Sequence, residues 1–366
     1  MTRYIIRRLL QAIPLLIIIS LLLFVLASNM GDPLASFGGR RRIRSEDRAR
    51  LKRLLGLDKP VIVQYAIWLL GNDWMDVDLN GNDIPGEDLD GDGLPDEVGT
   101  RRGVLRGDLG QSIINRTEIT FELAYRLPAT IEMITGAMII GVLVGVTVGV
   151  ISAVRRNSLF DIVGMIGALV GVSMPIFWLA LILIYALSVD AKILPPSGRI
   201  DAQIYIPRRT GFILLDTLLY GDLGAFFNAV WHLIMPSFVL STVIMPGLAR
   251  ITRASMLEVL RQDFVRTARA KGLAERVVIV EHALKNALLP VVTVIGGWLA
   301  GLLGGAILTE TVFSWPGMGL WAYRGIQGRD YPVVQGSVLV SAVIYVFVNL
   351  AVDVLYAYID PRIRYD

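Results

Sequence analysis

The sequence predicts an all-α membrane protein with six transmembrane helices. Apolar residues make up 54% of the 366 residues and charged residues only 18%, whereas soluble proteins have about 45–50% and about 25%. Six apolar stretches are each long enough to cross a hydrocarbon core of roughly 30 Å as a helix. Basic residues gather in the short segments beside several of these stretches. Together these features predict a multi-pass membrane protein.

The six predicted spans cover residues 9–28, 131–154, 162–189, 231–249, 288–308 and 334–358. Arginines flank three of them at positions 3, 7, 8, 155, 156, 362 and 364. Because basic residues favour the cytoplasmic side of short loops, we expect both termini to be cytoplasmic. The first span lacks an Ala-x-Ala cleavage site, so we interpret it as a retained membrane helix.

Proline and glycine positions predict how these spans bend and pack. Pro175, Pro236 and Pro246 fall inside spans and are expected to kink or break helices. Glycines recur every four residues at 141, 145 and 149 and again at 297, 301 and 305. Such small residues let helices approach closely. Packing within this chain and packing against a second membrane subunit both remain open.

One acidic residue, Asp353, lies inside a predicted span. Intramembrane acids are candidates for function. A single acid makes no proton relay, so we expect a structural hydrogen bond here.

Residues 250–287 form an unusually long polar segment between the fourth and fifth spans. Connections between helices normally need about 2–8 residues. The segment carries eight basic residues: Arg250, Arg253, Arg261, Arg266, Arg269, Lys271, Arg276 and Lys285. This excess predicts a cytoplasmic location, and we expect a helix around residues 264–274 with Gly272 allowing the chain to turn after it.

Residues 29–128 form a large region that the span count places outside the cell. Residues 45–57 have the spacing of an amphipathic helix. Within the same region, residues 71–101 form an acidic insert that contains two tandem patterns of alternating oxygen ligands. The candidate calcium ligands are Asp76, Asp78, Asn80 and Glu87, followed by Asp88, Asp90, Asp92 and Asp96. Alternate oxygens with a glycine for the sharp turn suit calcium.

The second pattern has Gly99 in place of the usual final glutamate, so a solvated acidic loop is the alternative to a calcium site. A further polar stretch at 200–228 has no chemistry that the sequence assigns.

Several function classes are excluded by what the sequence lacks. It contains no Gly-x-x-x-x-Gly-Lys-Ser/Thr motif for nucleotide phosphates, no cysteine, and only two histidines, His232 and His282. No serine, histidine and aspartate constellation is visible. We therefore expect no catalytic residues, no cofactor in the membrane core and no nucleic-acid partner.

Three groups of motifs resemble the permeases of the dipeptide, oligopeptide and nickel family of ABC importers. The first is Arg266-Thr-Ala-Arg-Ala-Lys-Gly272, with His282 and Pro290 beyond it. The second runs from Gly305 to Gly319, through Arg329–Gly336, to Asp360–Tyr365. The third comprises Leu55–Pro60, Gln64, Tyr65, Trp68 and Gly107–Ser112.

The resemblance implies a transport subunit of a prokaryotic inner (plasma) membrane and assigns a role to the basic segment. In such permeases a cytoplasmic coupling helix between the fourth and fifth spans docks on an ATPase. Carried over to this sequence, that docking loop comprises Arg266, Thr267, Ala268, Arg269, Ala270, Lys271, Gly272 and Leu273. The implied partners are a second homologous permease, two cytoplasmic ATPases, an external binding protein and a peptide substrate.

The resemblance also organises the chain into three parts. Residues 1–28 hold the N-terminus and first span, residues 29–128 the external region, and residues 129–366 the permease core with five spans and the coupling loop. Nickel or another small solute is an alternative substrate within the family. A transporter driven by an ion gradient is an alternative of a different class, although buried charge for ion binding is sparse. A membrane-anchored calcium-binding protein without transport is a third reading.

Overall fold

The computed structural model describes residues 2–31, 57, 59–73 and 101–359. These residues are helical or irregular, with a single isolated bridge between Gln111 and Glu118. The chain divides into two compact units. The first comprises Met1–Leu10, Arg126–Leu320 and Val343–Asp366, and the second comprises Gln11–Tyr125 and Trp321–Ala342. Each unit is described below by itself.

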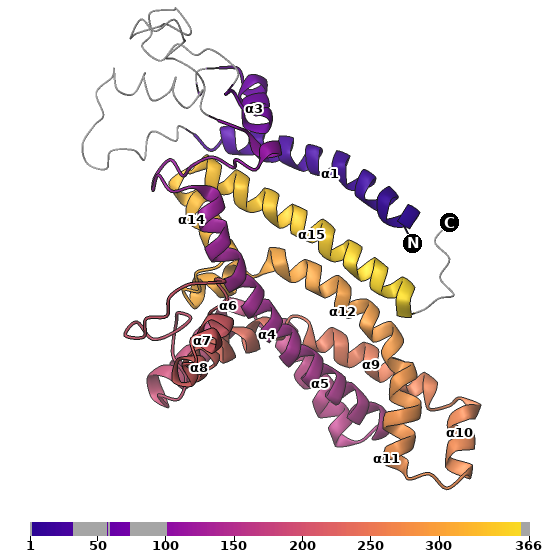
Figure 1. The fold of residues 1–366 in the computed structure, drawn as a ribbon. Helices are drawn as coiled ribbons and strands as arrows, with labels where there is room; N and C mark the ends of the chain where they lie inside the picture. The colour runs from indigo at the N-terminus through magenta and orange to yellow at the C-terminus, as the bar shows by residue number, and fades with distance from the viewer. Residues whose placement is uncertain (1, 32–56, 58, 74–100, 360–366) are drawn as a thin grey trace, which may run out of the picture. The chain divides into compact units, whose positions relative to one another are not determined.

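The helices follow one another along the chain as labelled in Figure 1. The first half contains α1 (Thr2–Ser28), α3 (Val61–Leu70), the short 3-10 turn η2 (Val104–Arg106), α4 (Ile119–Val154), α5 (Leu159–Ser173), α6 (Ile176–Leu183), the π-helical η3 (Ile184–Asp190) and α7 (Ile213–Leu219). The second half contains α8 (Leu223–Ser241), α9 (Met245–Val259), α10 (Asp263–Ala270), α11 (Glu275–Val277), the π-helical η4 (Val278–Leu284), α12 (Lys285–Gly305), α13 (Ile307–Val312), α14 (Met318–Gly328) and α15 (Tyr331–Ile359).

Five helices in the described part of the chain are long and apolar enough to cross a membrane. They are Tyr4–Ser28, Ile119–Val154, Leu223–Ser241, Glu275–Leu299 and Tyr331–Val354. A bent pair, Leu159–Gly171 with Ile176–Asp190, raises the number to six if it forms one span. The prediction of an all-helical protein with several spans is confirmed at this level.

Two of the predicted spans differ from the observed helices. The span expected at 162–189 is bent by 104° between α5 and α6. The span expected at 231–249 is wrong in its bounds, because α8 ends at Ser241 and α9 starts at Met245. Prolines account for both breaks. Pro175 precedes α6 and Pro246 occupies the first turn of α9, where a missing amide hydrogen costs nothing. Pro236, by contrast, lies within an unbroken α8.

The core of the first unit forms where α4 packs against the end of α8 and the start of α9. Its buried side chains include Met133, Ile134, Leu240, Ile244 and Leu248. The glycine stripe of α4 faces these residues. A Cβ added to Gly145 would lie 2.9 Å from the Met245 carbonyl oxygen, and one added to Gly149 would lie 2.6 Å from that of Ala249. This stripe therefore serves packing within the chain.

The second glycine stripe behaves differently. A Cβ added to Gly297 or Gly301 of α12 would meet nothing within 4 Å in the described part of the chain. Asp353 has the structural role expected for it. Its carboxylate accepts a hydrogen bond from the Tyr4 hydroxyl at 3.1 Å and pairs with Arg8 at 3.2 Å.

In the second unit, aromatic side chains hold α1, α3 and α15 together. Phe24, Tyr65, Trp68 and Leu339 form a buried cluster. The rings of Phe24 and Trp68 lie 5.8 Å apart between centroids, and the hydroxyls of Ser20 and Tyr65 are 2.8 Å apart. Asp330 caps the neighbouring loop by accepting hydrogen bonds from the Ser112 hydroxyl and the Ile113 amide.

Candidate functional site

The polar segment after α9 folds into a short helix, α10, that is held by one narrow apolar face. Val265 and Ala268 are the buried residues of α10. They pack against Val278 of η4, with Val259 and Leu260 beside them. In Figure 1, α10 lies next to α11 at the end of α12. The other residues of α10 are exposed, so their side chains are accessible to a partner molecule.

Of the eight residues assigned to the docking loop, only Ala268 is buried. The other seven are exposed: Arg266, Thr267, Arg269, Ala270, Lys271, Gly272 and Leu273. The structure adds Phe264, an apolar side chain that is 44% exposed on the same helix. Sequence reasoning missed this residue, although an aromatic ring next to the buried Val265 is a recognisable signal. Arginines, a lysine and apolar side chains thus share one small surface.

Two local features shape the end of α10. Gly272 has a φ of +75°, a left-handed conformation that glycine adopts without strain, and the chain reverses there towards α11. The Arg269 guanidinium donates to both carboxylate oxygens of Glu275, at 3.1 and 2.7 Å. These hydrogen bonds raise the pKa of Arg269. Because the pair is exposed, we expect it to fix the loop geometry more than to stabilise the fold.

An ion pair connects α9, the helix that leads into α10, with the start of α5. Arg253 donates from Nε and Nη2 to the two carboxylate oxygens of Asp161, both at 2.7 Å. Asp161 is 4% exposed and also accepts a hydrogen bond from the Asn157 amide at 3.0 Å. Bidentate arginine–carboxylate pairs fix orientation as well as distance. The pair therefore joins the α4–α5 connection to the helix that carries α10.

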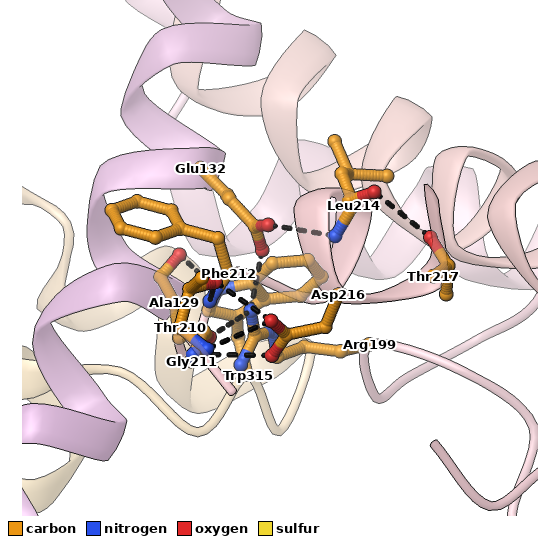
Figure 2. Close-up of polar contacts among 10 residues, drawn as sticks. All are labelled: Ala129, Glu132, Arg199, Thr210, Gly211, Phe212, Leu214, Asp216, Thr217 and Trp315. Atoms are coloured by element: carbon orange, nitrogen blue, oxygen red, sulfur yellow. Dashed lines mark hydrogen bonds and ion pairs between the residues drawn. The ribbon is translucent and has the colours of Figure 1, made fainter. Parts of the chain in front are cut away.

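A second group of polar residues surrounds Glu132 of α4 (Figure 2). Arg199 donates from Nη2 to Glu132 at 2.5 Å and to the Gly211 carbonyl oxygen at 3.0 Å. The Leu214 amide donates to the other Glu132 oxygen at 3.0 Å. The Arg199 guanidinium also lies 5.8 Å from the centroid of the Trp315 ring. This Glu132 cluster, defined by Glu132, Arg199, Gly211, Leu214 and Trp315, anchors the 200–228 stretch to α4.

A third buried acid, Glu310, binds the 315–320 loop to α4. Its carboxylate accepts hydrogen bonds from the Thr130 hydroxyl at 2.6 Å and the Leu320 amide at 2.8 Å. A Cβ on Gly317 would collide with the same carboxylate, so only glycine leaves room for it. Burial raises the pKa of Glu310 to about 7, although hydrogen bonds from Thr130, Leu320 and Gly319 act in the opposite direction.

These arrangements position helices and loops: the partners of Glu132, Asp161 and Glu310 are arginines, backbone amides and the Thr130 hydroxyl. Groups of three or more metal-ligating side chains are absent from the described part of the chain. The eight predicted calcium ligands, Asp76, Asp78, Asn80, Glu87, Asp88, Asp90, Asp92 and Asp96, lie outside the described residues. The amphipathic helix expected at 45–57 falls almost entirely outside them as well.

Comparison with protein families identifies the architecture. Residues 145–365 match the family described as binding-protein-dependent transport system inner membrane component. The chain belongs to this family. Residues 1–80 of the permease match the family described as the N-terminal part of the membrane component of binding-protein-dependent transport systems. The expectation that the chain is a transport subunit of the inner membrane, and not an enzyme, is thereby confirmed.

Curated relatives of the permease match along its whole length. It is 44% identical over 369 residues to the dipeptide transport system permease protein DppB of Escherichia coli (strain K12), covering 100% of this chain and 99% of the relative. It is 43% identical to the di/tripeptide transport system permease protein DppB of Pseudomonas aeruginosa, covering 100% and 99%. It is 36% identical to the oligopeptide transport system permease protein AppB of Bacillus subtilis, covering 100% of both chains.

Proposed function

We propose that this permease is one of two membrane subunits of an ATP-driven importer for dipeptides and short oligopeptides, and that α10 docks a cytoplasmic ATPase. The observation that carries the docking proposal is the exposed surface of α10. Phe264 and Leu273 offer apolar contact while Arg266 and Lys271 offer charge, and only Val265 and Ala268 are needed to hold the helix. Such a surface fits a groove lined by apolar and acidic side chains.

The transport mechanism follows from how α10 is attached. Closure of two ATPases on ATP would move α10, and the movement would pass to α9 and η4, against which it packs. The bidentate Arg253–Asp161 pair would carry the same movement to α5. The spans would then alternate between inward-open and outward-open arrangements.

The other partners rest on the family and on one further feature of the permease. A second homologous permease would complete the pathway, and an external binding protein would deliver the substrate. The α12 face bearing Gly297 and Gly301 has no neighbour in the described part of the chain, which suits close approach of another helix. The names of the relatives favour peptides over nickel and over a carrier driven by an ion gradient.

The docking proposal is tested by charge reversal on α10 in the reconstituted complex. Arg266→Glu with Lys271→Glu should abolish most peptide uptake and the ATP hydrolysis that the loaded binding protein stimulates. Gly272→Pro should do the same by preventing the turn. Arg209→Glu is the matched control. Arg209 is also an exposed arginine, but it stacks on Tyr220 and lies well before α10 in the sequence. Normal uptake in both α10 variants would refute the docking assignment.

We also propose that both termini and residues 250–287 face the cytoplasm, while residues 29–128 face outward. Single cysteines report this directly because the sequence has none. Asn115→Cys should react with an impermeant maleimide in intact cells, and Leu273→Cys only after lysis. Both positions are exposed in the structure. The reverse pattern would show that the orientation is inverted.

A further inference from the structure

A cavity in the second unit lies where two membrane helices end. Its lining includes Phe24 from the last turns of α1, Trp68 of α3, and Gln335 from the start of α15. Arg101 and Asp108 of the following loop, Gln64 of α3 and Tyr331 of α15 also belong to the wall. The cavity volume is about 50 Å³, measured as the space that the centre of a water molecule can occupy. Since one bound water needs about 10–15 Å³ on this measure, there is room for a small polar group.

The cavity wall contains hydrogen-bond donors that have no partner. The indole Nε1 of Trp68 is buried and makes no hydrogen bond in the described structure. Gln335 is 4% exposed, and the hydrogen bonds among the described residues include none from its amide. Buried polar groups are almost always satisfied, and leaving one unsatisfied costs about 1–3 kcal/mol. The unpaired Trp68 indole therefore points to a ligand with an acceptor atom.

The wall carries one positive and one negative side chain, Arg101 and Asp108. The guanidinium of Arg101 has no hydrogen-bond or ion-pair partner among the described residues. Burial lowers the pKa of Arg101, and the nearby Asp108 only partly opposes this effect. Arginine nevertheless stays charged in proteins. Asp108 is already engaged by backbone donors, because it accepts hydrogen bonds from the amides of Arg102 at 3.0 Å and Gly110 at 2.8 Å. The wall thus holds one guanidinium against a single carboxylate, Asp108, whose two oxygens already accept hydrogen bonds from backbone amides.

We propose that this cavity binds a phosphate group, and that the phosphate belongs to a phospholipid. The depth of the cavity supports the lipid as the source. Phe24 and Gln335 lie within the terminal turns of two apolar helices, and Trp68 and Tyr65 are the residue types that gather at the membrane–water boundary. The short helix α3 also exposes Val61 and Ile62, which are 41% and 66% exposed, as suits a helix lying along a membrane surface.

In this arrangement the Arg101 guanidinium donates to the phosphate oxygens, and Trp68 and Gln335 donate to the remaining acceptors. The acyl chains would leave the cavity beside α1 and α15, two helices that are long and apolar enough to cross a membrane. The bound lipid would fix α3 against the two spans. The inference is independent of ATPase docking, since it concerns a different unit of the chain.

The test uses the full chain, purified in mild detergent and stripped of lipid. Wild-type protein should bind short-chain phosphatidylglycerol, and Arg101→Gln should weaken this binding at least about tenfold, the loss expected for a charge-assisted hydrogen bond. Arg102→Gln is the matched control. Its side chain is exposed and outside the wall, and its backbone amide still binds Asp108, so binding should be unchanged.

Two further arms separate the alternatives. Trp68→Phe keeps the ring but removes the unpaired donor, and it should weaken binding without unfolding the aromatic cluster; a thermal melt of each variant checks the fold. Inorganic phosphate and a short-chain diacylglycerol should each bind far more weakly than the phospholipid. Equal binding by inorganic phosphate would overturn the lipid as the source. Unchanged binding in Arg101→Gln, or equal losses in Arg101→Gln and Arg102→Gln, would overturn the site.

Discussion

The charged side chains buried in this permease hold its helices and loops in place. Glu132 is paired with Arg199, and Asp161 with Arg253. Glu310 is held by a hydroxyl and by backbone amides. Ionisable residues inside membrane proteins usually mark ion or proton pathways, but no two of these acids share a partner. Their separation fits a transporter that takes its energy from elsewhere.

Removing Arg199 should be among the most damaging single changes in the first unit. Arg199→Met leaves the Glu132 carboxylate buried without a cation, which costs about 3–5 kcal/mol. Glu132→Gln combined with Arg199→Met should cost less than Arg199→Met alone, because no charge is then left buried. Thermal unfolding of the purified permease, followed by fluorescence, measures both. Arg209→Met should shift the midpoint little, and a loss equal to that of Arg199→Met would contradict the argument.

Glu310 should make stability depend on pH near neutrality. Its pKa is raised from 4.5 to about 7 in the folded protein, so the folded state binds the proton more tightly than the unfolded state does. The resulting stabilisation is complete below about pH 4.5 and is lost as the pH rises through about 7, by an amount of order 3 kcal/mol. Glu310→Gln removes the titration while keeping the shape.

Melting midpoints of wild type and Glu310→Gln should therefore be compared between pH 5 and pH 8. The wild type should lose stability relative to the variant across this range. Parallel curves for the two proteins would show that Glu310 keeps an ordinary pKa.

At the scale of elements, the central contact is that between α4 and the α8–α9 junction. Gly141, Gly145 and Gly149 let α4 approach the backbone of α9. The turn between Ser241 and Met245 places Ile244 and Leu248 in the core. A close helix pair of this kind transmits displacement because its side chains leave little space for independent movement.

Widening that contact should destabilise the permease and impair transport together. In Gly145→Val, the new side chain would collide with the Met245 carbonyl oxygen and the Leu248 Cβ, both 2.9 Å from an added Cβ. Overpacking of this kind typically costs about 1–3 kcal/mol. Gly167→Val in α5 is the matched control, since nothing lies within 4 Å of its added Cβ. Comparable losses of uptake in both variants would show that helix propensity, and not the contact, is responsible.

At the scale of the whole molecule, an all-helical fold with several membrane spans and a short helix in the basic segment could be predicted from the sequence, because apolar length and arginine placement are local properties. The 104° bend at Pro175 and the early end of α8 at Ser241 could not be predicted with certainty. A proline in a membrane helix either breaks it, as at Pro175, or remains inside it, as at Pro236, and the neighbouring helices decide which.

The buried pairs lay beyond sequence reasoning for a related reason. Arg199 and Glu132 are 67 positions apart, and Asp161 and Arg253 are 92 apart. Nothing local to either residue reveals its partner. Arg199 follows Ser197 and Gly198, a sequence typical of a loop. Asp161 comes just before the span predicted at 162–189, where an acid is ordinary at a helix start.

For the acidic insert at 71–101, we predict that calcium binding orders the segment. Calcium at high micromolar to millimolar concentration should protect residues 76–98 from hydrogen exchange, since a bound ion removes repulsion among the seven carboxylates of the eight candidate ligands. Magnesium should protect less, because it demands tighter octahedral geometry. The measurement compares the intact complex with calcium and with chelator. Identical exchange under both conditions would leave a solvated acidic loop.

The small apolar face of α10 has a consequence for a permease subunit that is not yet assembled with the proposed ATPase. Only Val265 and Ala268 secure this helix, so its local opening should cost far less than global unfolding. We expect its backbone amides to exchange quickly with solvent in the isolated subunit and slowly in the assembled complex. Opening would expose Val265, Ala268 and the backbone beside the arginines to cellular proteases. Subunits left without a partner would then be cleaved first at this helix, and assembly itself would determine how long each copy survives.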